Sequence, residues 1–264
     1  MKRTVLPILL IILAFSLGCI NPGNTRETTA PTLVPLNVST SDYSNWTVYV
    51  ISGENVTEYN LDELGEMPME EITDKDLSIG KTRVWRGVPP QKLGKGDVIN
   101  FVSDDLYLVS IPYYTKMILA LYVDGNPLQG NDAPIKLIVD LSYGCRCNWI
   151  KKIRVVEFVR KEECLSVYGE VFNILYFSPR TLNIFRGVDA IVKRENNSAR
   201  LGDILDKAIM KETAKNIVFV TENGRMRYPL ESVLEKNPLV VYEDGRFKIP
   251  EMGIDNLKGI KVEK

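Results

Sequence analysis

At 264 residues the chain has room for one large domain or two smaller ones, and with 45% hydrophobic and 25% charged residues it has an ordinary globular composition. A net charge of −1 without a basic stripe gives no electrostatic reason to expect nucleic acid as a partner. The sequence contains no histidine, which excludes Ser-His-Asp and Cys-His catalysis, histidine-ligated zinc or copper, and an imidazole pH switch.

Residues 1–19 have the pattern of an export signal that ends in a lipidation site. A basic start precedes the apolar run Val5–Leu17, which is shorter than the roughly 20 residues that span a bilayer. Cys19, preceded by glycine, resembles the cleavage and lipidation site of surface lipoproteins. Ser16 departs from that pattern, so a plain signal peptide and an uncleaved anchor are the alternatives. Lipidation of Cys19 predicts that the protein is extracytoplasmic and attached through the lipid to the outer face of the cell membrane.

Residues 20–44 form a predicted tether, because they are rich in Thr, Pro, Ser and Asn and contain few side chains able to build a core. We expect a folded domain over residues 45–160 and a second over residues 161–264. Four Asn-x-Ser/Thr sequons permit N-glycosylation of an exported chain in a host with the machinery, although such triplets also arise by chance. These sequons start at Asn37, Asn45, Asn55 and Asn196.

The first half of the folded part alternates predicted strands with turns and short helices. Asn60 is expected to cap a helix over Leu61–Glu66 by accepting from the N–H groups of its first turn. Met67–Arg83 is polar, and we expect it to be irregular. The other expected elements are a strand at Thr47–Ile51, a hairpin of Val98–Val102 with Leu106–Ile111, and a short helix that starts at Pro112.

The most informative stretch is Tyr122–Val159. Asp124-Gly125 is typical of a hairpin turn, because glycine adopts positive φ without a Cβ clash. Pro134 precedes a β-branched run, Ile135–Val139, that suits a buried strand. The remaining features of this stretch, in chain order, are Tyr143-Gly144, two cysteines around Arg146, Trp149, and an apolar strand at Ile153–Phe158.

This order of residues resembles the core signature of sulfite-oxidase-type molybdopterin-binding domains, a superfamily that includes periplasmic methionine-sulfoxide reductase catalytic subunits. Those domains carry a Gly-x-Pro-Leu turn, a Pro-x-basic-aliphatic strand, a Tyr-Gly loop that meets the pterin phosphate, and a closing Trp-aliphatic strand. The matching segments here are Gly125–Leu128, Pro134–Leu137, Tyr143-Gly144 and Trp149-Ile150. The resemblance implies an α+β, β-rich fold of the sulfite-oxidase-like type that contains a β-grasp-like element.

The resemblance also implies a set of candidate cofactor-binding residues. In its active members a cysteine ligates molybdenum, but the matching window here, Pro68–Trp85, has no cysteine, and the pterin-holding histidine is absent. No catalytic residue is therefore predicted, and the expected cofactor is either none or molybdopterin. Arg146 with its neighbouring lysines could hold a phosphate, with a solvated basic face as the alternative. The candidate cofactor-binding residues are Asn126, Lys136, Tyr143, Gly144, Arg146 and Lys151.

The expected folded part contains three cysteines, Cys145, Cys147 and Cys164. In an exported protein cysteines are expected to form disulfides, and two cysteines separated by one residue rarely bond each other without strain. We therefore predict a disulfide from Cys164 to Cys145 or Cys147, which leaves one thiol over. The resemblance would place that thiol near the pterin phosphate, so Cys145 or Cys147 is the alternative metal ligand. No other metal site is predicted.

Segments after Cys164 match segments of the first half in the same order, so the sequence predicts two tandem repeats. The second copy lacks the Tyr-Gly loop and its cysteines, which makes it the degenerate one. Among the six matches, Ile217–Val220 corresponds to Ile99–Val102, Val240–Gly245 to Leu121–Gly125, and Leu257–Val262 to Ile150–Val155.

Two helices are expected early in the second half. Ser178, followed by proline, is expected to cap the first, and Ser198 is expected to cap the second. The apolar residues of the second helix share one face at helical spacing. They are Leu201, Ile204, Leu205, Ala208 and Ile209.

Two functions from different classes agree with these observations. The first is a non-catalytic surface lipoprotein that reuses the scaffold to bind a small anion, a pterin cofactor or a surface protein partner. The second is an extracytoplasmic molybdopterin-dependent oxidoreductase with an altered metal site. The missing cysteine and histidines favour the first, whereas the retained Gly-Asn-Pro-Leu and Tyr-Gly segments support the second.

Overall fold

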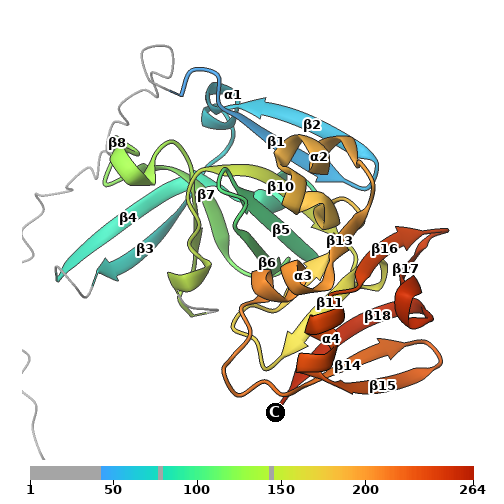
Figure 1. Cartoon of the computed structure of the whole chain (residues 1–264). Helices are drawn as coiled ribbons and strands as arrows, with labels where there is room; N and C mark the ends of the chain where they lie inside the picture. The colour runs from blue at the N-terminus through green and yellow to red at the C-terminus, as the bar shows by residue number, and fades with distance from the viewer. Residues whose placement is uncertain (1–42, 77–79, 143–145) are drawn as a thin grey trace, which may run out of the picture. The chain divides into compact units, whose positions relative to one another are not determined.

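The computed structural model describes residues 43–76, 80–142 and 146–264, all of which lie in one compact unit, Leu33–Lys264. This part of the chain is β-rich, as predicted, and its strands form three sheets (Figure 1).

The first half contains β1 (Thr47–Ser52), β2 (Asn55–Asn60), α1 (Leu61–Gly65), β3 (Glu70–Asp76), β4 (Lys81–Val88), β5 (Val98–Ser103), β6 (Leu108–Pro112), β7 (Met117–Val123), β8 (Asn126–Pro127), β9 (Lys136–Val139) and β10 (Ile153–Val159). The second half contains β11 (Leu165–Gly169), β12 (Leu175–Phe177), α2 (Val188–Lys193), β13 (Ser198–Arg200), α3 (Leu201–Ala208), β14 (Asn216–Thr221), β15 (Gly224–Pro229), α4 (Leu230–Lys236), β16 (Leu239–Glu243), β17 (Arg246–Ile249) and β18 (Ile254–Glu263). Short 3₁₀ helices cover Pro90–Lys92, Gly130–Asp132, Arg146–Asn148, Lys161–Glu163, Thr181–Arg186 and Pro250–Met252.

The first sheet is built around β10, the last strand of the first half. β10 lies between β1, to which it is parallel, and β5, to which it is antiparallel. The hairpin partners of those strands complete the order β2-β1-β10-β5-β6. In the register, Val155 lies opposite both Tyr49 and Val102. A last strand inserted between two hairpins in this way is the β-grasp-like arrangement.

Five strands of the second sheet have the same order and directions. β18 lies between the parallel strand β11 and the antiparallel strand β14, whose hairpin partners are β12 and β15. β11 pairs with the C-terminal part of β18, and β17 pairs with its N-terminal part at Ile254 and Leu257; β16 and β13 extend the sheet beyond β17. Val220 was matched with Val102; Val220 lies opposite Gly259, and Val102 lies opposite Val155. The residue that corresponds to Val155 is therefore Gly259, and the predicted match of Val155 with Val262 is wrong by three residues.

The third sheet contains β3, β4, β7, β8 and β9. Part of it forms from Met67–Arg83, which was expected to be irregular and instead supplies β3 and the start of β4. The ribbon pairs Ile72 with Trp85, and these two side chains are buried in a small core, whereas most of the flanking residues are charged. Because so few apolar residues mark this ribbon, the alternation typical of a strand is obscured.

Two tight turns, one in each half, have the same backbone conformation. The turn after β7 has φ values of 51° at Asp124 and 80° at Gly125, as the sequence predicted for a hairpin. The turn after β16 has 51° at Asp244 and 78° at Gly245. Two successive positive φ values are the mark of a type I′ turn, in which glycine removes the Cβ clash at the second position.

The two halves share their largest hydrophobic core. One face of the first sheet, with Val50 and Phe101, packs within the first half. The other face, with Ile51, Val102 and Val155, lies in a core that is otherwise made by the second half. Each such buried aliphatic side chain contributes about 1.5–3 kcal/mol relative to exposure. The halves are therefore not independent domains, although their strand order is the same.

Helix boundaries follow the prediction in part. Asn60 caps α1 in a capping box: its Oδ1 accepts from the N–H of Glu63 at 2.8 Å, and the Glu63 carboxylate accepts from the N–H of Asn60 at 2.8 Å. The expected helix at Pro112 is absent from the described chain, because Pro112 ends β6 and pairs with Val98. Ser198 lies in β13 and caps no helix, so that prediction is wrong.

The predicted apolar face of α3 is buried, with the exception of its last member. Leu201, Ile204, Leu205 and Ala208 belong to the shared core. Ile209 follows the helix in a left-handed conformation and is 42% exposed. The helix ends one residue earlier than the spacing suggests, and this turns Ile209 away from the core.

Candidate functional site

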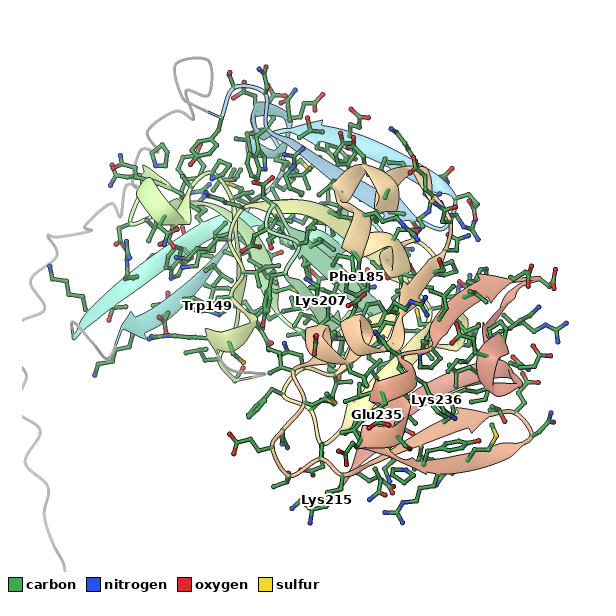
Figure 2. All side chains as sticks on the ribbon, in the orientation of Figure 1. Trp149, Phe185, Lys207, Lys215, Glu235 and Lys236 are labelled. Carbon is green, nitrogen blue, oxygen red and sulfur yellow. The ribbon has the colours of Figure 1, made fainter. Side chains whose placement is uncertain are left out.

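Lys136, the predicted basic position, begins β9, and its buried ammonium lies between two tryptophans. Its Nζ is 4.7 Å from the ring centroid of Trp85 and 5.4 Å from that of Trp149, which is labelled in Figure 2. The two rings meet edge to face with centroids 5.7 Å apart. Nζ also donates a hydrogen bond to Asp132 at 3.0 Å. Burial lowers the pKa of Lys136, and the hydrogen bond and charge of Asp132 partly offset this.

The other predicted basic residues are also paired with carboxylates. Asp132 accepts from Lys136 and lies 3.3 Å from Lys151. Burial opposes ionisation of Asp132, but the two lysines hold its pKa below the ordinary value. Arg146 donates to the buried Asp74 at 2.6 Å. The positive charges that the resemblance assigned to a phosphate are thus matched by acidic residues of the chain.

The remaining predicted cofactor-binding residues are Asn126, Tyr143 and Gly144. The Asn126 amide donates to the Asp124 carbonyl at 3.1 Å and so stabilises its own turn. Tyr143 and Gly144, like Cys145, lie outside the described residues. The described part of the predicted site therefore supports the local fold.

The cysteines do not pair as predicted. Cys147 is disulfide-bonded, whereas Cys164 carries a free thiol and is buried, so a bond of Cys164 to Cys145 or Cys147 is not formed. Cys164 follows a 3₁₀ helix and points into a small apolar cluster with Val98 and Val159. Burial raises the pKa of this thiol, with the nearby acidic residues adding to the effect, so Cys164 serves as an apolar packing residue.

The residues of this region do not fit a molybdenum pterin. The window Pro68–Trp85, where the resemblance requires a thiolate, folds mainly as the ribbon of β3 and β4, and its buried carboxylate Asp74 is bound by Arg146. Lys136 would meet a phosphate only by releasing the Asp132 carboxylate, with which it already forms an ion pair at 3.0 Å. Among the described residues, no group of three or more His, Cys, Asp or Glu side chains is placed to hold a metal ion.

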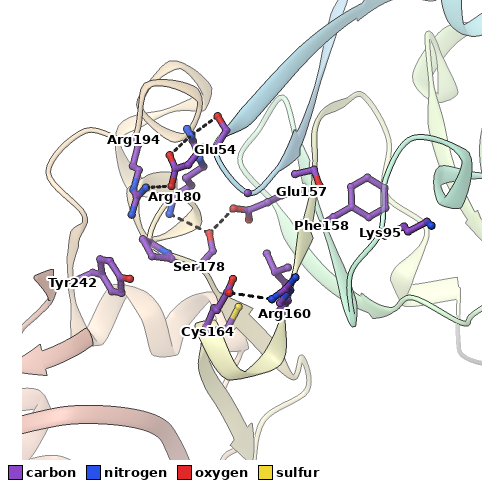
Figure 3. Close-up of a pocket in the computed structure, with 15 residues that line it drawn as sticks. Glu54, Lys95, Glu157, Phe158, Arg160, Cys164, Ser178, Arg180, Arg194 and Tyr242 are labelled. Carbon is purple, nitrogen blue, oxygen red and sulfur yellow. Dashed lines mark hydrogen bonds and ion pairs between the residues drawn. The ribbon is translucent and has the colours of Figure 1, made fainter. Parts of the chain in front are cut away.

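A second region, which the sequence did not predict, is a pocket of about 600 Å³ that we call the seam pocket (Figure 3). Its lining comes from the β1–β2 turn, the end of β10, the segment after β12, and single residues of the second half. Its charged lining residues are the basic Lys95, Arg160, Arg180 and Arg194 and the acidic Glu54, Glu157 and Glu163.

Glu157 forms the buried acidic part of the seam pocket. It lies in β10 and is 3% exposed. Ser178 Oγ donates to its Oε1 at 2.5 Å, and Asn100 Nδ2 donates to its Oε2 at 3.2 Å (Figure 3 shows the serine contact). Burial raises the pKa of Glu157 despite these hydrogen bonds and the charge of Arg180. Glu157 therefore keeps its proton to higher pH than an exposed glutamate does.

Two arginines share one exposed carboxylate at one side of the pocket. The Arg180 side chain is only 9% exposed and donates through Nη1 to the Val192 carbonyl at 2.7 Å. Its Nη2 lies 3.3 Å from Glu54 Oε2, and Arg194 donates to Glu54 Oε1. The hydrogen bond and charge of Arg194, with those of Arg180, lower the pKa of Glu54. Glu54 itself sits in the β1–β2 turn with 76% of its side chain exposed.

Lys95 and Arg160 lie toward the other side of Glu157 in Figure 3. Both residues are exposed, and Arg160 makes only a loose contact of 3.9 Å with Glu163. Surface ion pairs of this kind contribute little to the free energy of folding, because water competes for both charges. The pocket thus presents four cations against the two exposed carboxylates Glu54 and Glu163, with Glu157 favouring its neutral form.

Sequence reasoning missed the seam pocket because its lining is scattered from Ser52 to Tyr242 along the chain. One signal was available: Glu157 interrupts the otherwise apolar strand segment Val155–Val159. The second signal was Ser178, for which the sequence predicted only one of its two contacts. As expected of a helix cap, its Oγ accepts from the N–H of Thr181 at 3.0 Å where the 3₁₀ helix begins. The same hydroxyl also binds Glu157, which was not predicted.

The predicted modification sites are only partly covered by the structure. Cys19 and Asn37 lie outside the described residues, whereas Asn45, Asn55 and Asn196 are exposed. Their glycosylation stays a prediction. Within the described part of the chain, no helix has both the length and the apolarity to cross a membrane.

Comparison with known proteins does not assign the chain to a family. No family model matches the chain, and no curated protein matches it. Among solved structures, the sulfane dehydrogenase SoxCD from Paracoccus pantotrophus matches with a TM-score of 0.37 and 10% sequence identity, over 84% of this chain and 76% of that one. Similarity at this level assigns neither a family nor a function, so the functional argument rests on the residues described above.

Proposed function

We propose that the protein is a lipid-anchored, non-catalytic binding module on the outer face of the cell membrane, and that its seam pocket holds a small anionic ligand. Export and anchoring rest on the signal-like segment 1–19 and its Cys19. The binding role rests on the charge and burial of the seam pocket. The oxidoreductase alternative is less favoured, because the basic residues it needs are paired with internal carboxylates.

The observation that carries the proposal is the buried guanidinium of Arg180 in the pocket wall. A buried cation needs a compensating anion, because desolvation is costly. The neighbouring carboxylate Glu157 is pushed toward its neutral form by burial, and the remaining partner, Glu54, is largely exposed to solvent. Arg194, Lys95 and Arg160 add further positive charge around the same cavity. Such a pocket favours an anion small enough to enter about 600 Å³.

Binding is tested by isothermal titration calorimetry of purified protein with acetate, succinate, phosphate and sulfate against a chloride background. At least one of these anions should bind saturably, and the affinity should fall as ionic strength rises. The double variant Lys95→Ala/Arg160→Ala should bind about 10-fold or more weakly, since each charge-assisted contact is worth about 1.5–3 kcal/mol. Both side chains are exposed, so folding should be preserved.

The matched control is Lys236→Ala/Arg225→Ala, which removes the same charges from exposed positions that do not line the pocket; Lys236 lies on α4 (Figure 2). This control should bind as the wild type does. Absence of saturable binding by every anion, or equal weakening in both double variants, would contradict the proposed pocket. Anchoring is tested separately: Cys19→Ala should release the protein from membranes or leave its precursor unprocessed.

A further inference from the structure

Glu54 bridges the two arginines of the seam pocket as a ligand carboxylate would. Each of its two oxygens meets a different guanidinium, Oε1 that of Arg194 and Oε2 that of Arg180. Glu54 comes from the tip of the β1–β2 hairpin, whereas both arginines belong to the second half of the chain. Arg180 precedes the 3₁₀ helix Thr181–Arg186 and Arg194 follows α2, so two arginines from neighbouring segments of the second half bind one planar carboxylate from the first.

The arginine pair has contacts other than those to the Glu54 carboxylate. Arg180 is buried to nine-tenths; its Nη1 donates to the Val192 carbonyl at 2.7 Å and its Nη2 to the main-chain carbonyl of Glu54 at 3.3 Å. Arg194 ends α2 in a left-handed conformation with φ of 59°, its guanidinium carbon lies 5.9 Å from the Tyr242 ring centroid, and its backbone N–H caps the helix. Glu54, in contrast, is exposed and sits beside Gly53 in a two-residue turn. Arg180 therefore keeps its main-chain partners when the exposed Glu54 carboxylate moves away.

On the basis of the proposed function, we infer that the ligand is a small dicarboxylate, and that Glu54 occupies the place of one ligand carboxylate in the unliganded protein. The first ligand carboxylate would replace Glu54 between Arg180 and Arg194. The second would meet Lys95 and Arg160, which lie toward the other side of Glu157 (Figure 3). A tetrahedral oxyanion presents one charged centre, whereas a dicarboxylate presents two, which suits basic residues on both sides of the pocket.

Exchange of Glu54 for a ligand carboxylate is physically easy. The incoming ligand carboxylate gives the buried Arg180 the same kind of charged partner that it loses, so no buried cation is left unpaired. The released Glu54 returns to water, while the arginines keep the same kind of partner. Glu54 thus acts as a competing internal anion that lowers the apparent affinity for the external one.

The inference is tested by calorimetric titration of succinate, glutarate, butyrate and sulfate into the wild type and Glu54→Gln. Succinate or glutarate should bind more tightly than butyrate and sulfate. Glu54→Gln removes the competing charge and should tighten dicarboxylate binding about fivefold, because the ligand no longer has to displace a carboxylate from Arg180 and Arg194. Glu58→Gln, an exposed change on the same hairpin that does not line the pocket, is the matched control and should leave affinity unchanged.

A measurement on the wild type guards against a variant that folds poorly. Hydrogen exchange at the β1–β2 turn should become faster when succinate binds, because Glu54 loses its two arginine contacts. Weaker or unchanged binding by Glu54→Gln, slower exchange at the turn, or equal affinity for butyrate and succinate would each overturn the inference while leaving anion binding intact. Failure of every anion to bind would overturn the proposed function itself.

Discussion

Replacing Glu157 with glutamine should make the protein more stable at neutral and alkaline pH. Glutamine has the same shape: its amide oxygen can accept from Asn100, while its NH₂ group donates to Ser178 Oγ, whose hydroxyl can turn to Thr181. The substitution removes only the ability of this buried side chain to ionise. A Glu157→Ala change would instead remove the carboxylate oxygens that accept from Asn100 and Ser178 and would leave a cavity, and it would mix these costs with the effect of charge.

The sign follows from the raised pKa of Glu157. The folded protein keeps this proton over a pH range in which the unfolded chain, with the ordinary glutamate pKa of 4.5, has lost it. The stability associated with the proton is fully present below pH 4.5 and is lost as pH rises through the folded-state pKa. Within that window the wild type loses about 1.4 kcal/mol of unfolding free energy per pH unit, whereas Glu157→Gln does not.

Urea unfolding of both proteins, followed by tryptophan fluorescence at pH 4.5, 6, 7 and 8, measures this difference. The stability of Glu157→Gln relative to wild type should increase with pH and then level off. Glu163→Gln is the matched control, because that side chain is 64% exposed in the same pocket, and it should show no such trend. A stability difference that does not vary with pH would refute the reasoning and would make Glu157 an ionised partner of Arg180.

Three further changes test other parts of the molecule. Asn60→Ala removes the capping box of α1 and should lower the unfolding free energy by about 0.5–2 kcal/mol in urea; an unchanged midpoint would contradict the capping role. Asp132→Asn leaves the buried Lys136 without its carboxylate and should destabilise by about 3 kcal/mol. Because burial lowers the pKa of Lys136, that deficit should shrink as pH is raised, and a deficit that grows would argue against the pair. The Cys164 thiol should react with Ellman's reagent only after denaturation, and Cys164→Ser should remove that increment; reaction in the native protein would contradict its burial.

Local rules predicted the parts of the fold that depend on neighbouring residues. The capping box at Asn60 and the turn at Asp124-Gly125 need only a few adjacent side chains, and both form as expected. The start of α3 could not be found in this way. Its first turn is capped by Asn237, whose Oδ1 accepts from the N–H of Gly202 at 2.8 Å. That cap comes from far along the chain, whereas the nearby Ser198 pairs in a strand.

The site was harder to predict than the fold for the same physical reason. Lys136 was assigned to a cofactor site by the resemblance, and Arg146 with Lys151 because they lie close together in the chain. Neither argument could show that Asp132 and Asp74 pair with these residues. The seam pocket depends on contacts between the two halves. No single stretch of sequence carries that information, apart from the lone buried carboxylate in β10.

The position of β10 and β18 has a consequence for the order in which the molecule can fold. Each of these strands is the last of its half in the sequence and yet lies at the centre of its sheet, between strands formed much earlier. Hairpins such as β1–β2 and β14–β15 can form from adjacent residues, but neither sheet can close until its last strand is available. A chain that crosses a membrane in extended form would therefore reach the far side before it buries its core, and loss of only the final strand would leave β11 and β14 as two unpaired edges.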